Sequence, residues 1–321
     1  MLLQELDLEV IGYSLTPEKD SLYSLLNRDG AIFEKFDDVS NHSEVLKFIQ
    51  ETKPAAIFHL AAQPLVLASY EQPAETFKTN VMGTVSILEA AFSVKSVKAV
   101  AAITTDKVYR NSNLGEKFIE TDPLEGKDPY SASKVGSEAA VSAWQQILKL
   151  HGGPRVVAVR AGNVIGGGDY ARDRLIPDLI RAYRSDTAVT IRNPESTRPW
   201  QHVLDPLIGY VMAIEKSILG DENLSYNFGP TEGSLSVSDV VSVFKNDLGK
   251  NTEVIFEKLE TKSEAKTLDL DSTRARSALK WSPTLSQIEA IEMTFGWWKA
   301  VIDQNLSPSE MIKRDLLTFL K

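Results

Sequence analysis

The first half of the chain alternates short apolar runs with longer segments of helical periodicity, joined by short polar connections. This alternation is typical of strand–helix–strand crossovers, which build a parallel sheet with helices on both faces. We therefore predict an α/β fold with a doubly wound parallel sheet. The expected strands are 9–13, 31–36, 56–60, 97–104 and 155–160, and the expected helices are 21–28, 43–52, 73–92 and 131–150.

The alternation loosens after the three glycines at 166–168, where the expected elements become shorter. A chain of 321 residues can hold one large domain or two. We expect residues 1–165 to form the main sheet with its helices. Residues 166–321 are expected to be mainly a smaller substrate-binding portion, with some segments that return to the main sheet. The residues of this portion expected to pack in a core are Trp281, Trp297 and Trp298.

Composition argues against several classes of function. The formal net charge of −9 and the lack of a basic block argue against nucleic acid as the main partner. The chain has no cysteine and four scattered histidines, so neither disulfides nor a metal site are expected. No apolar run reaches membrane-spanning length, and the acidic first residues lack the basic region of a signal peptide. We expect a soluble cytoplasmic protein without a membrane partner.

Residues Thr104–Lys107 directly follow the apolar run 97–103, so they fall at the carboxyl end of a strand, where open α/β sheets bind ligands. Tyr130 and Lys134 lie four residues apart at the start of a predicted helix and share one of its faces. A lysine in that position is expected to lower the pKa of the tyrosine. About 0.6 such pairs are expected by chance in a chain with nine tyrosines, so the position after the strand carries the prediction.

Three further features are candidates for ligand contacts. Ala61-Ala62-Gln63 places small side chains after strand 56–60, which either a flat cofactor or ordinary packing explains. The glycines at 166–168 form either a plain flexible turn or a turn that wraps a ligand. Guanidinium groups bind phosphate oxygens in pairs, although a single surface arginine is more often a solvated charge. The candidates for holding a diphosphate are Arg174, Arg192 and Arg198, the last in a predicted loop at 198–202.

Several segments together resemble the extended short-chain dehydrogenase/reductase family, in its branch of sugar-nucleotide 4,6-dehydratases. They span most of the chain, at 58–66, 79–84, 105–107, 128–134, 160–169, 173–177, 191–194 and 198–203. Members that act on dTDP-glucose carry Thr-Asp-Glu where this chain has Thr105-Asp106-Lys107, and the last segments are specific to the CDP-sugar branch. The resemblance implies CDP-glucose as substrate, NAD as cofactor, and a Rossmann-type dinucleotide-binding domain, incomplete at its N-terminus, over residues 1–165.

The resemblance also implies a role for each catalytic residue. Tyr130, as a phenolate, would take the proton of the 4-hydroxyl while C4 gives a hydride to NAD. Asp106 would protonate the departing C6 hydroxyl, and Thr105 would orient the sugar by hydrogen bonding. Lys107 either removes the C5 proton or acts only through its charge. Lys134 would support Tyr130, and hydride return to C6 would yield CDP-4-keto-6-deoxyglucose without consuming the cofactor.

Ligand-binding residues are implied in the same way. No acidic residue ends the strand 9–13, so the residues themselves leave both NAD and NADP open. The implied cofactor-binding residues are Asp38, Val39, Leu60, Ala61, Ala62, Gln63, Thr79, Thr104, Tyr130 and Lys134. The implied substrate-binding residues are Asn163, Arg174, Arg192, Arg198 and Gln201.

The chain departs from the family at its beginning. Members open with a strand and a Gly-x-x-Gly-x-x-Gly turn that holds the cofactor's pyrophosphate, and this chain contains no such segment. Residues 1–6 resemble the end of the first helix, so about 25 residues of a strand–helix unit are expected to be missing, through a misplaced start or a fragment. Strands 9–13 and 56–60 should then flank a vacant position about 9–10 Å wide without pairing. The alternatives are an epimerase or other dehydratase of the superfamily, and a non-catalytic remnant.

The family pairs two helices of each subunit across a two-fold axis into a four-helix bundle. The corresponding helices here are 73–92 and 131–150, which predicts a homodimer. Their apolar positions exceed what one face of a sheet needs. The positions that carry this excess are Val81, Val85, Leu88, Val141 and Trp144.

Overall fold

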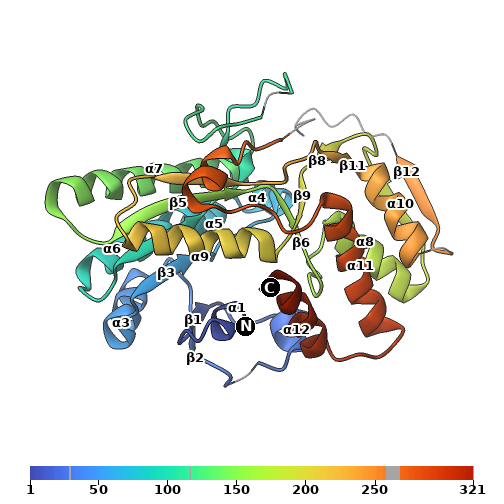
Figure 1. Ribbon diagram of the computed structural model, residues 1–321, viewed down its shortest axis with the longest axis horizontal. Helices are drawn as coiled ribbons and strands as arrows, with labels where there is room; N and C mark the ends of the chain where they lie inside the picture. Colours follow the sequence, from blue (N-terminus) through green and yellow to red (C-terminus); the bar gives the residue numbers. More distant parts are fainter. Residues whose placement is uncertain (29, 116, 250, 258–267, 321) are drawn as a thin grey trace.

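The computed structural model describes residues 1–28, 30–115, 117–249, 251–257 and 268–320. Its main part is a parallel sheet with helices packed on both faces (Figure 1). The strand order is β10–β5–β4–β3, and every neighbouring pair is parallel. The predicted doubly wound parallel fold is therefore confirmed. These strands are β3 (Ala56–His59), β4 (Ala99–Ile103), β5 (Arg155–Ala161) and β10 (Ser225–Phe228).

Side-chain alternation along the buried strands explains the two layers of helices. Val100 and Ala102 of β4 pack in one core, together with residues of α3, α6 and α7. Ala99 and Ala101 of the same strand belong to the core on the opposite face, beneath α9. These helices are α3 (His42–Thr52), α6 (Gly83–Ser93), α7 (Pro129–His151) and α9 (Leu204–Ile218).

The two long helices predicted at 73–92 and 131–150 are present with different boundaries. The first consists of α5 (Pro73–Phe77), a π-helical turn η1 (Lys78–Met82) and α6. The second, α7, begins earlier because Asp128 caps it: its carboxylate accepts from the backbone N of Ser131 at 2.9 Å. This cap places Tyr130 in the first turn of α7.

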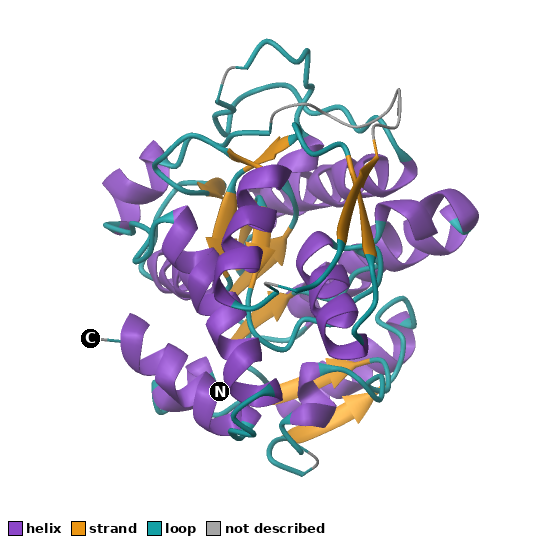
Figure 2. Cartoon of the chain, turned by 90° about the vertical axis from the view of Figure 1, so that its right-hand side faces the viewer, coloured by secondary structure: helices purple, strands orange, loops and turns teal. Residues whose placement is uncertain are grey.

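The first two strands form a small sheet of their own. β1 (Ile11–Ser14) and β2 (Phe33–Phe36) pair in parallel, and the short helices α1 (Leu2–Glu5) and α2 (Leu22–Leu25) accompany them. In the described ranges β1 does not pair with β3, whose strand neighbour is β4. Figure 2 shows the β1–β2 pair at the lower edge of the view. The prediction that 9–13 and 56–60 do not pair is confirmed, and the separation of about 9–10 Å stays a prediction.

Residues beyond Gly162 add shorter elements around a second core. Trp297 and Trp298 are buried in that core and Trp281 is buried beneath α9, as expected. Residues 198–202, predicted as a loop, form strands instead, because 200–202 pair in parallel with 163–165. The remaining elements are α4 (Val66–Glu71), η2 (Asp106–Val108), β6 (Asn163–Ile165), α8 (Leu175–Ser185), β7 (Val189–Arg192), β8 (Thr197–Arg198), β9 (Trp200–His202), β11 (Leu235–Ser236), α10 (Val237–Asp247), β12 (Val254–Glu257), η3 (Ala275–Leu279), α11 (Gln287–Ile302) and α12 (Pro308–Phe319).

The part of the chain that the structure describes has neither a membrane-spanning helix nor a group of metal ligands. No helix there is both long and apolar enough to span a lipid bilayer. Nor do three or more His, Cys, Asp or Glu side chains in that part gather in a group that could hold a metal ion.

Candidate active site

The residues that follow β4 form the centre of the candidate site. Thr105 caps the short turn η2, and its hydroxyl accepts from the backbone N of Lys107 at 3.4 Å. The same hydroxyl donates to Asp106 Oδ1 at 3.0 Å. Lys107 Nζ lies 3.3 Å from that Oδ1 atom, so one carboxylate oxygen serves both neighbours. The Thr-Asp-Lys sequence is thus folded into one hydrogen-bonded cluster.

Asp106 presents its second oxygen, Oδ2, without a hydrogen-bond partner among the described residues. The side chain is fully buried, and a buried carboxylate oxygen is costly unless it meets a donor. Gly162 lies behind it, since a Cβ there would be 3.3 Å from Oδ2 and 2.9 Å from Cγ of Pro199. Oδ2 is thus an unused acceptor that the protein encloses.

Tyr130 is buried in the first turn of α7, where its phenol shares a hydrogen bond with the side chain of Thr105. Its backbone N donates to Ser69 Oγ at 3.1 Å. Burial raises the pKa of Tyr130 to about 12; the Thr105 hydrogen bond opposes the rise and the Asp106 carboxylate adds to it. The expected lowering of this pKa is therefore not found in the protein without ligands, because burial dominates.

Lys134 reaches the same strand end from the next turn of α7. Its Nζ donates to the backbone carbonyl of Ile103, the last residue of β4, at 3.1 Å. Burial lowers the pKa of Lys134 to about 8, and the Glu138 carboxylate opposes this fall. An ammonium group has three donors, so the bond to Ile103 leaves two that could bond with a ligand.

Most of the residues predicted to bind a cofactor follow the ends of three strands, and the others lie in η1 and α7. Val39 and Ala61 share one apolar cluster with α3 and α6, which brings the ends of β2 and β3 together. The carboxyl ends of β3 and β4 meet because these strands are parallel neighbours. The predicted residues are distributed as Asp38 and Val39 after β2, Leu60, Ala61, Ala62 and Gln63 after β3, Thr79 in η1, and Thr104 after β4.

Asp38 is ordered by its own loop. Its Oδ1 accepts from both the backbone N and the Oγ of Ser40 at 2.8 Å. The backbone bond from Ser40 is the main cause that holds the Asp38 pKa below its usual value. Lys78 Nζ lies 3.8 Å from the other carboxylate oxygen. The side chain is therefore a fixed negative charge at the end of β2.

Asn80 is a site residue that sequence reasoning missed. Its Oδ1 accepts from the backbone N of Gln63 at 2.8 Å, and its Nδ2 donates to the Gln63 carbonyl at 3.1 Å and to Ser133 Oγ at 2.8 Å. The Ser133 hydroxyl donates in turn to the Tyr130 carbonyl at 2.6 Å. Asn80 thus joins the segment after β3 to the first turns of α7. Its place in the family-like segment 79–84 was the available signal.

The residues predicted to bind the substrate are only partly brought together. Arg174 is close enough to Tyr130 to lower its pKa, and its Nη1 lies 3.2 Å from Asp169 Oδ2. Gln201 is buried in β9, next to β6; its Nε2 donates to the carbonyl of Phe228 at 2.9 Å, and its Oε1 has no partner among the described residues.

The other three substrate predictions have different surroundings. Arg198 is buried, with Nη1 donating to the Thr197 carbonyl at 2.7 Å. Asn163 is half-buried at the start of β6, paired in register with Trp200. Arg192 is exposed at the end of β7, where its charge acts on Asp178 of α8. The structure therefore does not place Arg192 beside Tyr130 and Asp106.

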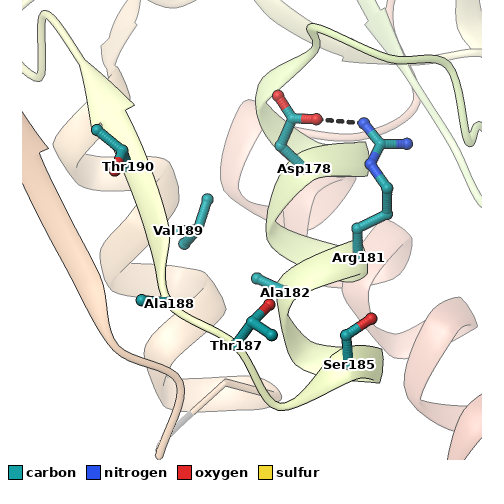
Figure 3. A pocket seen from close by; sticks show the side chains of 8 residues that line it. All are labelled: Asp178, Arg181, Ala182, Ser185, Thr187, Ala188, Val189 and Thr190. Carbon is teal, nitrogen blue, oxygen red and sulfur yellow. Dashed lines mark hydrogen bonds and ion pairs between the residues drawn. The ribbon is translucent and has the colours of Figure 1, made fainter.

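Figure 3 shows a surface depression between α8 and β7. Its one charged contact joins Arg181 to Asp178, and the pair satisfies both side chains. None of the predicted site residues lines it, so we assign it no ligand. The lining residues are Asp178, Arg181, Ala182, Ser185, Thr187, Ala188, Val189 and Thr190.

Two solved structures have the same fold as this chain. A dTDP-glucose 4,6-dehydratase double mutant from Streptomyces venezuelae, crystallised with NAD, superimposes with a TM-score of 0.79. The match covers 96% of this chain and 95% of that one, at 22% sequence identity. The dTDP-glucose 4,6-dehydratase of Bacillus anthracis, in complex with NAD, gives a TM-score of 0.78 at 20% identity and covers 93% of this chain and 90% of that one. At these identities the matches establish the fold.

Sequence comparison is more specific. A protein of Salmonella typhimurium described as CDP-glucose 4,6-dehydratase is 39% identical over 94% of this chain and 86% of its own length. A dTDP-glucose 4,6-dehydratase of Haemophilus influenzae is 25% identical over 92% of this chain and 90% of its own length. The family model described as GDP-mannose 4,6 dehydratase matches residues 16–294. This chain therefore belongs to the GDP-mannose 4,6-dehydratase family.

Proposed function

We propose that this protein is an NAD-dependent sugar-nucleotide 4,6-dehydratase that converts CDP-glucose to CDP-4-keto-6-deoxyglucose. The single observation that carries the proposal is Asp106, a buried carboxylate bonded to Thr105 and Lys107, whose second oxygen has no partner among the described residues. An acid in that position suits the removal of a hydroxyl as water. The 39% identity to a relative described as CDP-glucose 4,6-dehydratase supports both the reaction and the substrate.

The first step needs a base for the 4-hydroxyl proton of the sugar, and we assign it to Tyr130. With a pKa of about 12 the residue is a phenol at neutral pH before ligands bind. Lys134 supplies a positive charge at the same strand end, and the Thr105 hydroxyl, which donates to Asp106 before ligands bind, would turn to donate to the developing phenolate. Bound NAD would supply the hydride acceptor for C4 and, once reduced, the hydride donor for C6, so it would not be consumed.

The second step is the loss of water across C5 and C6. The ketone at C4 makes the C5 proton acidic. When Lys107 is the base, the proton shared by the pair starts on Asp106 and Lys107 is neutral. Asp106 then protonates the departing C6 hydroxyl through Oδ2 while the C5 proton passes to Lys107, so the pair ends as carboxylate and ammonium. Lys107, held 3.3 Å from Asp106 Oδ1, is in place either to take the C5 proton or to stabilise the enolate by charge. Thr105 orients the sugar. We keep both roles for Lys107 open, because its contact with Asp106 serves either.

Cofactor binding is proposed for the residues at the three strand ends. Thr104 and Lys134 suit the polar groups of NAD near the reacting centre, and Asp38 suits a ribose hydroxyl at the far end. The small side chains of Ala61 and Ala62 let a flat ring approach the backbone. No residue of this chain is assigned to the pyrophosphate, since the chain has no Gly-x-x-Gly-x-x-Gly segment. The remaining proposed contacts are Val39, Leu60, Gln63, Thr79 and Tyr130.

For the substrate, Arg174 and Arg198 are proposed to meet the diphosphate, since a guanidinium binds phosphate oxygens in pairs. Asn163 and Gln201 would contact the sugar nucleotide from β6 and β9. Arg192 lies at the end of β7 and is proposed only for an outer contact. Residues 1–165 are thus proposed to hold the cofactor and to carry the catalytic groups, and residues 166–321 to supply most of the remaining substrate contacts.

A cytoplasmic homodimer is proposed as the assembly. Leu88, Val141 and Trp144, counted before as outward positions, pack in the core against the sheet and do not support it. The support comes instead from large apolar residues that α5, η1 and α7 leave exposed. These are Phe77, Met82, Ile147 and Leu150.

The function is tested by incubating the purified protein with NAD and either CDP-glucose or dTDP-glucose, then measuring the alkaline absorbance of the keto sugar. CDP-glucose should be converted, and NADP should not replace NAD. The variant Tyr130→Phe should keep its melting temperature and lose at least about a hundredfold in turnover. Conversion of dTDP-glucose alone would contradict the substrate, and NAD-loaded protein without any product would contradict the reaction.

A further inference from the structure

A buried ion pair lies one helical turn beyond Lys134 on α7. Glu138 Oε1 accepts from Arg160 Nε at 2.7 Å, and Oε2 accepts from Arg160 Nη2 at 2.8 Å. Both side chains are only 5% exposed. The same Oε1 also accepts from the hydroxyl of Thr104 at 2.6 Å. A carboxylate held by two parallel N–H bonds and a hydroxyl has one orientation, so its charge is fixed in place.

Two further hydrogen bonds hold the Arg160 side chain. Its Nη1 donates to the Tyr109 hydroxyl at 2.7 Å and to the Glu120 carbonyl at 3.1 Å. Burial works against the Arg160 charge, but the bonds to Glu138 and Tyr109 outweigh it and raise its pKa. The arginine is therefore a permanent, immobile partner that keeps Glu138 facing the end of β4.

Glu138 acts on Lys134 in two ways. Its bond to Thr104 fixes the peptide unit whose carbonyl, that of Ile103, accepts from Lys134 Nζ. Its negative charge opposes the fall in the Lys134 pKa that burial causes. His59 of β3 also faces Lys134, but burial first and then the lysine charge lower the His59 pKa to about 3, so the imidazole is neutral. Glu138 is thus the carboxylate that favours an ammonium here.

We propose that Glu138 is a positioning residue for the reaction: it keeps Lys134 an ammonium with its donors aimed at the bound cofactor, and Arg160 holds Glu138 in place. The proposal rests on the proposed function, because the charge of Lys134 matters to turnover only if the chain oxidises a sugar with NAD. Neither residue was singled out by the sequence, since each is a common charged residue inside a predicted element.

The variant Glu138→Gln keeps the shape and the acceptor oxygen but removes the charge. Titration of isotope-labelled lysine by NMR, with Lys134→Arg to assign the signal, measures the Lys134 pKa without any cofactor or substrate. We expect it to fall by about one unit or more, since an opposite charge at close range is removed. The alkaline limb of kcat should move down by the same amount, which lowers turnover roughly tenfold at pH values above the wild-type pKa of about 8.

A matched control is Glu120→Gln. Glu120 is also a buried carboxylate, but its Oε1 accepts from the backbone N of Asn227 and its Oε2 faces Arg274, away from Lys134. This variant should lose stability without moving either the Lys134 pKa or the alkaline limb. A purely structural role for Glu138 would make the two variants alike.

Glu138→Gln leaves Arg160 without its carboxylate, so the double variant Glu138→Gln/Arg160→Gln provides a second route if the single variant folds poorly. The downward shift of the Lys134 pKa should persist in the double variant while its melting temperature recovers. An unchanged Lys134 pKa, with normal turnover by the wild type, would overturn the role of Glu138. A shifted pKa in a wild-type protein that makes no keto sugar would instead refute the proposed function, and the role in catalysis with it.

Discussion

Replacing Asp315 by asparagine probes how the C-terminal helix α12 is held against β9, the strand that carries Gln201. Asp315 Oδ2 lies 3.9 Å from His202 Nε2, and both side chains are almost fully buried. The His202 ring also stacks on Phe319, with ring centroids 5.0 Å apart. Its Nδ1 accepts from the backbone N of Leu204 at 3.4 Å, so a neutral ring carries its proton on Nε2, facing Asp315.

Burial reverses the usual order of the two pKa values, so that the pKa of Asp315 lies above that of His202. It raises the pKa of Asp315 from 3.8 to about 7 and lowers the pKa of His202 from 6.5 to about 4. A carboxyl with a raised folded pKa stabilises the fold below pH 3.8, and this contribution is lost as the pH rises through about 7. A histidine with a lowered folded pKa has the opposite effect, so stability rises between about pH 4 and 6.5.

In the wild type the gain from His202 offsets only part of the loss from Asp315, and each variant removes one of the two contributions. Between about pH 5.5 and 8, linkage gives a loss of about 2 kcal/mol from Asp315 and a gain of about 1 kcal/mol from His202. Relative to wild type, Asp315→Asn should therefore gain about 2 kcal/mol of stability over this range. His202→Gln should lose about 1 kcal/mol relative to wild type over the same range.

Urea denaturation followed by tryptophan fluorescence measures both differences. Trp297 and Trp298 report on the unfolding of this region, because they share a core with Met311 of α12. Comparing each variant with wild type at every pH cancels the titration of all other groups. Differences that stay constant with pH in both variants would refute the reasoning, and so would a change of the same sign in both.

Two further substitutions test the site itself. In Gly162→Ala the new Cβ would lie 3.3 Å from Asp106 Oδ2 and 2.9 Å from Pro199, so kcat should fall roughly tenfold or more and the crowding should lower the free energy of unfolding by about 1–3 kcal/mol; full turnover would show that Asp106 Oδ2 needs no such clearance. Asn80→Ala removes the bonds to Gln63 and Ser133, so unfolding in urea should require about 2–3 kcal/mol less and NAD should bind more weakly. Unchanged NAD affinity in a destabilised Asn80→Ala protein would limit this residue to a structural role.

Local sequence pattern predicted β3, β4 and β5 of the main sheet, because these strands are short apolar runs between helical segments, but it did not name β10 and did not show that β1 and β2 pair in a separate sheet. The alternation that faces Val100 and Ala102 to one core and Ala99 and Ala101 to the other is a property of any buried strand. The start of α7 shifted to Pro129 because of a cap at Asp128 that the sequence also carries. These features depend on neighbours in sequence, which is why they could be predicted.

Features that depend on distant partners were missed. Residues 198–202 carry a proline and two aromatic or ring side chains, a loop-like composition, yet 200–202 pair with 163–165 and the backbone N of Trp200 donates to Gln287 Oε1 at 2.9 Å. The π turn at Lys78–Met82 accompanies a similar contact, in which the Asn80 carbonyl accepts from Ser137 Oγ at 2.7 Å. Neither partner is near in sequence, so neither effect has a local signal.

The electrostatics of the candidate site were predicted least well. Spacing shows that Tyr130 and Lys134 share a helix face, but not which group each will bond. In the structure the lysine bonds to the carbonyl of Ile103 and the phenol to Thr105, and burial sets the sign of the Tyr130 pKa shift. Counting apolar positions likewise could not separate a face toward the sheet, where Leu88 lies, from an outer face.

The transfer of the sugar's own C4 hydrogen tests the central claim most directly. CDP-glucose carrying deuterium at C4 is incubated with the NAD-loaded protein, and the product is examined by NMR and mass spectrometry. We predict a 4-keto-6-deoxy product in which the deuterium has moved to C6. Deuterium found at C4 of a CDP-hexose with inverted configuration would contradict the claim and indicate an epimerase. Loss of the deuterium to the solvent would also contradict the claim.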